Sequence, residues 1–165
     1  MRMAVMAAGA VGGYFGGRVA AAGHDVVFIA RGAHGDALRR DGLKIESALG
    51  DLHLKKVNVT DDPKRVGPVD VVLFAVKLWD TETAGEQTRA LVGPNTRVIT
   101  LQNGVDSVER LAPITDGPRA KAPRFRLPPF AGAMAQTPGA VRVWKRASAR
   151  EGRPLSDCWS GAGQY

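Results

Sequence analysis

Short runs of apolar residues alternate with stretches of helical periodicity along the first 113 residues of this 165-residue chain. The apolar runs are rich in valine and isoleucine and too short for helices, which indicates strands buried on both faces of a parallel sheet. Such strands, separated by helices, are typical of an α/β fold with a doubly wound, mostly parallel sheet and right-handed crossovers. We predict strands at 3–6, 25–29, 69–76 and 96–101, and helices at 11–22, 33–41, 81–91 and 105–111.

Local signals mark the ends of two helices and the position of a hairpin. Asp80 is the expected N-cap of the helix at 81–91, and Pro113 is expected to end the last predicted helix. The segments 43–45 and 52–54 alternate apolar with polar residues. We therefore predict a solvated antiparallel hairpin there.

A glycine-rich turn follows the first predicted strand and opens the first helix. Its residues are Ala7, Ala8, Gly9, Ala10, Val11 and Gly12. The spacing is that of a dinucleotide-binding fingerprint whose first glycine is replaced by Ala7, a change whose cost depends on the φ angle there. Gly9 would let the backbone approach a pyrophosphate, Gly12 would let the helix pack on the strand, and the first helical N–H groups would receive the phosphate charge. A turn without a ligand is the alternative, but the strand–turn–helix–strand context favours a Rossmann-like binding domain.

The end of the second strand indicates which dinucleotide is bound. NAD-binding domains usually place Asp or Glu there, about 20 residues after the fingerprint, to hold the ribose hydroxyls. This chain has Arg31 instead. A guanidinium can bind a 2′-phosphate bidentately, a contact that contributes about 1.5–3 kcal/mol. We therefore predict NADPH as the cofactor; the alternative is that Arg31 is a solvated loop charge.

Two later residues fall at the same predicted edge of the sheet. Lys77 directly follows the strand at 69–76, and Asn103 follows the strand at 96–101. Taken singly, the first could be a charge at a strand exit and the second part of an Asn-Gly turn. Because open α/β sheets bind ligands beyond the carboxyl ends of their strands, we predict that both join Arg31 and the glycine-rich turn in one site.

Other chemistry finds little support in the sequence. His24, His34 and His53 fall in different elements without metal-ligand spacing, and we interpret them as surface or loop histidines. The single cysteine, Cys158, has no obvious activating partner and rules out a disulfide framework. No run reaches the roughly 18 apolar residues that a membrane-spanning helix needs. We expect a soluble cytoplasmic protein without a metal site or a catalytic acid–base pair of its own.

Composition changes in the last third of the chain. Residues 1–113 carry 14 Lys and Arg against 13 Asp and Glu, whereas residues 114–165 carry 9 against 3. Valine, isoleucine and leucine number 29 before the change and 5 after it, while 6 of the 10 prolines come after it. We predict an irregular basic tail with one weak strand pair, 131–135 and 140–144. A basic tail can bind nucleic acid, but aromatic interleaving is sparse here, so we do not expect a nucleic-acid partner.

Several motifs occur in an order and at spacings that are specific. They are AAGAVGGYFGG at 7–17, GHDV at 23–26, FIARG at 28–32, VVLFAVKLWD at 71–80 and LQNG at 101–104. Over about residues 1–113 the chain thereby resembles the N-terminal NADP-binding domain of the 2-dehydropantoate 2-reductase (ketopantoate reductase) family. The resemblance implies that residues 9–12 hold the pyrophosphate of NADPH and Arg31 its 2′-phosphate. It also implies that Lys77 lies near the ribose and nicotinamide, and that Asn103 contacts both the cofactor and the keto acid substrate.

The resemblance also implies a reaction and the parts that perform it. In this family of oxidoreductases, hydride passes from NADPH to the ketone of 2-dehydropantoate, which gives pantoate for pantothenate and coenzyme A biosynthesis. A lysine on a second, helical domain acts as the general acid, because the alkoxide that forms must take up a proton. That domain also supplies much of the substrate pocket and the contacts of a homodimer.

Beyond residue 113 the chain continues this pattern only faintly, at 138–142. We expect the helical catalytic domain to be absent and this truncated form to be inactive alone. The alternative is an NADP-binding module that senses the cofactor or pairs with a separate catalytic subunit. Sequence divergence, a short homologue and out-of-frame translation would each explain the change. We favour out-of-frame translation, because enrichment in Arg, Pro, Ala, Gly and Ser with isolated Trp is typical of a shifted frame in GC-rich DNA.

Overall fold

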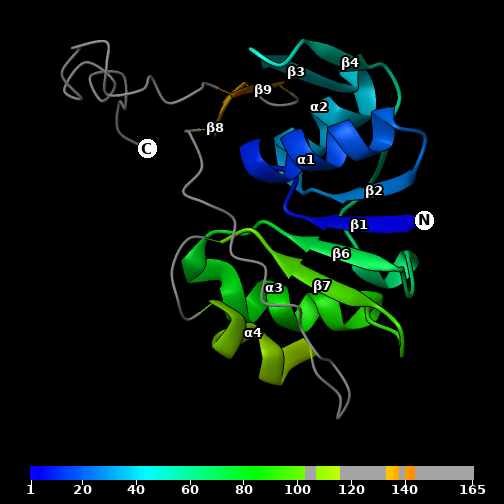
Figure 1. The fold of residues 1–165 in the computed structure, drawn as a ribbon, viewed down its shortest axis with the longest axis vertical. Helices are drawn as coiled ribbons and strands as arrows, with labels where there is room; N and C mark the ends of the chain where they lie inside the picture. The colour runs from blue at the N-terminus through cyan, green and yellow to red at the C-terminus, as the bar shows by residue number, and fades with distance from the viewer. Residues whose placement is uncertain (103–106, 116–132, 138–139, 144–165) are drawn as a thin grey trace, which may run out of the picture.

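The computed structural model describes residues 1–102, 107–115, 133–137 and 140–143 (Figure 1). Its centre is a sheet of five parallel strands in the order β5-β2-β1-β6-β7. The strands are β1 (Arg2–Met6), β2 (Asp25–Ile29), β5 (Asn58–Thr60), β6 (Val71–Phe74) and β7 (Arg97–Thr100). The order and direction of these strands confirm the predicted Rossmann-like, doubly wound parallel sheet.

Two helices cover each face of this sheet (Figure 1). They are α1 (Ala10–Ala21) and α2 (Gly32–Asp41) on one face, and α3 (Thr81–Thr88) and α4 (Ser107–Thr115) on the other. Successive side chains of a strand point to opposite faces, so both layers of helices pack on the same strands. In β1, for example, Val5 belongs to the apolar cluster under α1, and Met6 belongs to the cluster under α3 and α4.

Glycines in α1 let this helix pack closely between two sheets. A Cβ on Gly16 would lie 2.6 Å from Val5 Cγ2 and 2.8 Å from Phe28 Cε1, both on the parallel sheet. A Cβ on Gly17 would lie 2.5 Å from Ile45 Cδ1 on a second, smaller sheet. Since real Cβ atoms do not approach so closely, a larger residue at either position would force neighbouring side chains to shift.

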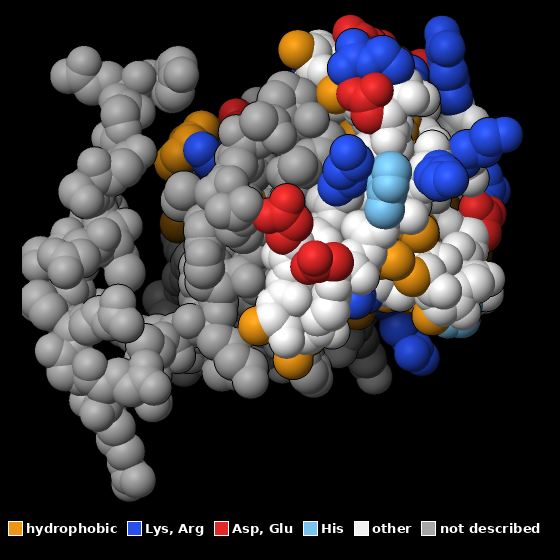
Figure 2. Space-filling view, turned by 90° about the horizontal axis from the view of Figure 1, so that it is seen from above, with side chains coloured by type: hydrophobic (Ala, Val, Ile, Leu, Met, Phe, Trp, Pro, Cys, Tyr) orange, Lys and Arg blue, Asp and Glu red, His pale blue; other side chains and the backbone are white. Residues whose placement is uncertain are grey.

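The second sheet has the strand order β4-β3-β9-β8. Its strands are β3 (Leu43–Ser47), β4 (Leu52–Leu54), β8 (Ala133–Thr137) and β9 (Ala140–Val143). The antiparallel pairing of β3 with β4 confirms the predicted hairpin, and the antiparallel pairing of β8 with β9 confirms a strand pair in the tail. In addition, β9 pairs in parallel with β3, so this part of the tail belongs to the fold. Figure 2 looks onto this side of the molecule and shows Lys and Arg side chains among Asp and Glu.

The structure departs from the sequence-based prediction at both later helices. Helix α3 ends at Thr88 and is followed by a 3₁₀ turn, η3 (Arg89–Leu91), and the Asp80 side chain makes no capping hydrogen bond. The prediction that Pro113 ends the last helix is wrong, because α4 continues to Thr115. Proline lacks an N–H donor and crowds the carbonyl four residues before it. The turn after Pro113 is nevertheless formed, and Thr115 Oγ1 donates to the carbonyl oxygen of Leu111 at 3.0 Å across that position.

Packing against α3 also holds the end of α4 in place. A Cβ on Gly85 of α3 would lie 3.2 Å from Ile114 Cδ1 and 3.3 Å from Leu111 Cδ1. Leu111 is buried within the apolar cluster on this face of the parallel sheet. None of the helices in the described ranges is long and apolar enough to cross a membrane.

Candidate functional site

Three of the predicted site segments meet at one edge of the parallel sheet. In the sheet, β2 and β6 flank β1, and Met6 at the end of β1 pairs in register with Ile29 and Phe74. The glycine-rich turn, Arg31 and Lys77 directly follow these three strand ends. The structure therefore brings these residues together as the sequence predicts. Asn103 lies outside the described residues, and its place in the site stays a prediction.

Ala7 is the first residue of the glycine-rich turn and adopts a left-handed backbone conformation. Its φ angle is 66°, and it is the one non-glycine residue with positive φ in the described ranges. This is the position where the fingerprint usually has glycine, because a Cβ makes left-handed backbone unfavourable by about 1–2 kcal/mol. The turn therefore keeps the shape that glycine would give it, at the cost of strain at Ala7.

The rest of the turn leaves backbone N–H groups unpaired beside open space. Gly9 is the N-cap of α1, and a Cβ added to it would have no heavy atom within 4 Å. The first helical hydrogen bond runs from Gly13 N to Gly9 O at 2.7 Å, so the N–H groups of the preceding residues have no partner within the helix. A Cβ on Gly12 would collide with the carbonyl oxygen of Ala7 and lie 2.9 Å from Val5 Cγ1 of β1, which confirms the predicted close packing of the helix on the strand. This arrangement suits an anionic ligand.

Two cations lie at the neighbouring strand ends. Arg31 is the N-cap of α2 and is exposed, and its guanidinium has no ion-pair partner within the part of the chain that the structure describes. Lys77 is exposed too, and its Nζ lies 4.8 Å from the ring centroid of Trp79, whose side chain is 73% exposed. Both charges are therefore available to a ligand on this edge.

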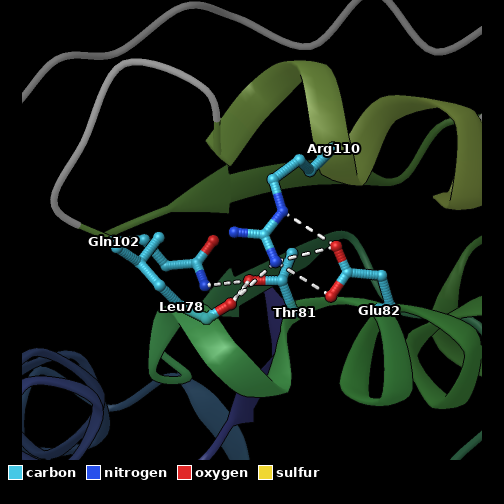
Figure 3. A network of polar contacts seen from close by, with 5 residues as sticks. All are labelled: Leu78, Thr81, Glu82, Gln102 and Arg110. Atoms are coloured by element: carbon cyan, nitrogen blue, oxygen red, sulfur yellow. Dashed lines mark hydrogen bonds and ion pairs between the residues drawn. The ribbon is translucent and has the colours of Figure 1, made fainter.

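A polar network holds the segment that carries Lys77 (Figure 3). Leu78 begins a 3₁₀ turn, η2 (Leu78–Asp80), and its carbonyl oxygen accepts from Arg110 at 2.9 Å and from Thr81 Oγ1 at 2.9 Å. The Thr81 hydroxyl in turn accepts from Gln102 Nε2 at 2.7 Å. Groups from α3, α4 and the end of β7 thus fix the backbone next to Lys77.

The network also contains an ion pair between two helices. Arg110 of α4 donates from Nε to Glu82 Oε1 at 2.8 Å and from a terminal nitrogen to Oε2 at 2.9 Å. These bonds, and a backbone N–H donated to the carboxylate, hold the pKa of Glu82 below its ordinary value. The bidentate geometry fixes α4 relative to α3 on this side of the sheet.

His34 is a site residue that the sequence-based interpretation missed. It lies in the first turn of α2 and is half-buried, and its interpretation as a surface or loop histidine overlooked its contact with the turn. Its Nε2 lies 2.7 Å from the carbonyl oxygen of Ala8 in the glycine-rich turn. Its position in the sequence could have indicated this contact, because His34 comes three residues after Arg31 and just beyond a strand that neighbours the turn. Among the described residues, no group of three or more His, Cys, Asp or Glu side chains is placed to hold a metal ion.

Several curated relatives match the chain over about two thirds of its length. A 2-dehydropantoate 2-reductase of Mesorhizobium japonicum is 35% identical over 106 residues, which are 64% of this chain and 32% of that protein. One of Archaeoglobus fulgidus is 40% identical over 111 residues, 67% of this chain and 35% of that protein. The chain thus spans about a third of the length of these curated relatives.

Solved structures share the fold. A 2-dehydropantoate 2-reductase from Geobacter metallireducens superposes with a TM-score of 0.76 at 30% identity, over 91% of this chain and 52% of that chain. A ketopantoate reductase from Ralstonia eutropha gives 0.73 at 34% identity, over 88% of this chain and 47% of that one. A D-mandelate dehydrogenase with bound NADH and anilino(oxo)acetate gives 0.71 at 20% identity, over 88% of this chain and 46% of that one, which is a likeness of fold alone.

A family model completes these comparisons. The sequence model of the ketopantoate reductase PanE/ApbA family matches residues 3–127 of this chain. It covers most of the chain and reaches beyond residue 113, to about which the sequence resembles this family. This chain therefore belongs to the ketopantoate reductase family.

Proposed function

We propose that this chain binds NADPH along the edge formed by the ends of β2, β1 and β6. One observation carries the proposal: the unpaired N–H groups at the start of α1 and the exposed guanidinium of Arg31 follow neighbouring strands. A diphosphate and a 2′-phosphate are the two anionic parts of NADPH. The site offers a separate cationic or N–H donor group for each of them.

The turn at residues 7–9 fits a pyrophosphate. The space next to Gly9 is open, and the first turn of α1 contains no acidic side chain that would repel an anion. Gly9, Ala10, Val11 and Gly12 would hold the pyrophosphate through backbone N–H groups, while Ala7 and Ala8 shape the turn. Arg31 would hold the 2′-phosphate, and Lys77 would lie near the ribose and nicotinamide.

The reaction we propose is the reduction of 2-dehydropantoate to pantoate in pantothenate and coenzyme A biosynthesis. This proposal rests on family membership and on relatives that are named 2-dehydropantoate 2-reductases. When bound, NADPH supplies the hydride. Asn103 would contact both the cofactor and the keto acid, and the general acid would come from the family's helical domain.

A second candidate function is a binding module that pairs with a separate catalytic subunit or senses the cofactor. It is favoured by one observation, that the groups gathered at the sheet edge are the N–H donors of α1 and the cation of Arg31, which suit binding of an anion. An assay of NADPH oxidation with 2-dehydropantoate separates the two candidates. Turnover by the polypeptide alone supports the reductase, whereas cofactor binding without turnover supports the module.

The cofactor assignment is tested by Arg31→Asp with isothermal titration calorimetry. The variant replaces a cation with a carboxylate that repels a 2′-phosphate, so NADPH should bind about ten- to a hundredfold more weakly, with a much smaller effect on NADH. Lys44→Asp is the matched control, because it makes the same charge change at an exposed residue of β3. Equal weakening of NADPH and NADH by Arg31→Asp would contradict the assignment.

A further inference from the structure

We propose that His34 is a positioning residue that holds the glycine-rich turn in its ligand-binding shape. The inference rests on the proposed binding of NADPH. His34 Nε2 lies 2.7 Å from the carbonyl oxygen of Ala8. Because a carbonyl oxygen only accepts, the imidazole must carry its proton on Nε2 and donate it to Ala8. This hydrogen bond joins α2 to the turn that opens α1.

The bond fixes the direction of a backbone donor that the ligand would use. The carbonyl of Ala8 and the N–H of Gly9 belong to one planar trans peptide, so they point in opposite directions. When His34 holds the carbonyl toward α2, the Gly9 N–H is held facing away from α2. That N–H has no acceptor within the described part of the chain, and the space next to Gly9 is open. His34 thus orients a free donor without touching the ligand.

Apart from His34, the backbone around Ala8 has little to hold it in place. Ala7, directly before Ala8, has a φ angle of 66° that its Cβ disfavours. The other hydrogen bond of Ala8 to a neighbouring element, from its N–H to Ile29 O, is long at 3.4 Å. Rotation of the peptide after Ala8, about ψ of Ala8 and φ of Gly9, would misdirect the Gly9 N–H. The bond from His34 opposes that rotation.

The same bond links the two halves of the proposed phosphate site. His34 stands three residues after Arg31, in the first turn of the helix that Arg31 caps. Gly35 N donates to Arg31 O at 3.3 Å, so this first turn is formed and rigidly connected. His34 therefore joins the backbone at the start of α2 to the pyrophosphate turn.

The test compares nucleotide affinities of the full chain and its His34 variants by calorimetry. His34→Leu removes the donor and should weaken NADPH and NADH by a similar factor of about five to ten, because both carry the pyrophosphate. His34→Gln places an amide N–H at the same distance along the side chain and should restore most of the affinity. His24→Leu, at an exposed histidine beyond the other end of α1, should change neither affinity.

Three results would overturn the inference. They are unchanged affinity in His34→Leu, a loss confined to NADPH (which would make His34 a 2′-phosphate contact), and equal loss in His34→Gln and His34→Leu. If His34→Leu does not fold, the ¹⁵N spectrum of the wild-type imidazole decides, since a ring protonated on Nδ1 alone cannot make this bond. If the wild-type chain binds neither nucleotide, the proposed function fails and this inference fails with it. If the wild type binds and His34→Leu binds equally well, only this inference fails.

Discussion

At the scale of single residues, Ala7 shows how the cofactor turn is held against local preference. Its positive φ angle costs about 1–2 kcal/mol with a side chain present, whereas glycine adds about 0.4–1 kcal/mol of flexibility to the unfolded chain. Ala7→Gly should therefore raise the free energy of unfolding by up to about 1 kcal/mol. Urea denaturation of the purified chain measures this change.

Ala33→Gly is the control for that substitution. Ala33 is exposed in the first turn of α2, with ordinary helical backbone, so glycine there should lower the free energy of unfolding by about 0.5–1 kcal/mol. Destabilisation of the same size by Ala7→Gly and Ala33→Gly would show that Ala7 is not strained.

At the scale of elements, the glycines within α1 and at its N-cap have two different roles. Gly16→Ala places a methyl group 2.6 Å from Val5 and should destabilise the fold by about 1–3 kcal/mol through overpacking. Gly9→Ala meets no atom of the protein and should change stability by less than about 1 kcal/mol, yet obstruct the approach of the pyrophosphate. Thermal melts of both variants measure the effect on stability, and NADPH titrations measure the effect on cofactor affinity. Retained NADPH affinity in Gly9→Ala would contradict the proposed binding mode.

The ion pair between α3 and α4 gives the fold an acid-sensitive contact. The pKa of Glu82 is lowered in the folded protein by its hydrogen bond from Arg110, so the pair stabilises the fold above the unfolded carboxyl pKa of about 4.3. That contribution is lost as the pH falls through the lower folded pKa. Glu82→Gln should therefore reduce the melting temperature at pH 7 and have progressively less effect as the solution is acidified. A difference between wild type and variant that stays constant down to pH 3 would rule out this origin.

At the scale of the whole molecule, the strands that the sequence predicts best are those buried on both faces. The apolar runs of β1, β2 and β6 are signs of double burial, and their common direction follows from the intervening helices. The edge strand β5 escaped prediction because it has three residues, begins with Asn58 and lacks an apolar run. The pairing of β9 with β3 also escaped, since contacts between segments nearly a hundred residues apart leave no local signal.

The site residues also divide into those with a local sequence signal and those without one. The turn at residues 7–12, Arg31 and Lys77 could be placed on one edge because each follows a predictable strand. His34 and the contact between Arg110 and Glu82 could not, because both depend on how helices pack in three dimensions. The roles of Asn103 and of the residues after 113 stay predictions.

The strand pair in the tail contributes to the fold as a whole. Because β9 forms backbone hydrogen bonds with β3, a chain that ends at residue 131 would lose this pairing and leave the edge of β3 uncovered. We expect its melting temperature to fall by several degrees, which differential scanning calorimetry measures. An unchanged melting temperature would show that 133–143 adds nothing to stability.

The central claim is that one edge of the parallel sheet binds a nicotinamide dinucleotide and selects the one with a 2′-phosphate. A fluorescence titration of the wild-type chain with NADPH and with NADH, at fixed salt, tests it most directly. We predict saturable binding of NADPH with an affinity at least about tenfold above that for NADH, from the charge-assisted contact with Arg31. A folded chain that binds neither nucleotide at millimolar concentration, or prefers NADH, would contradict the account.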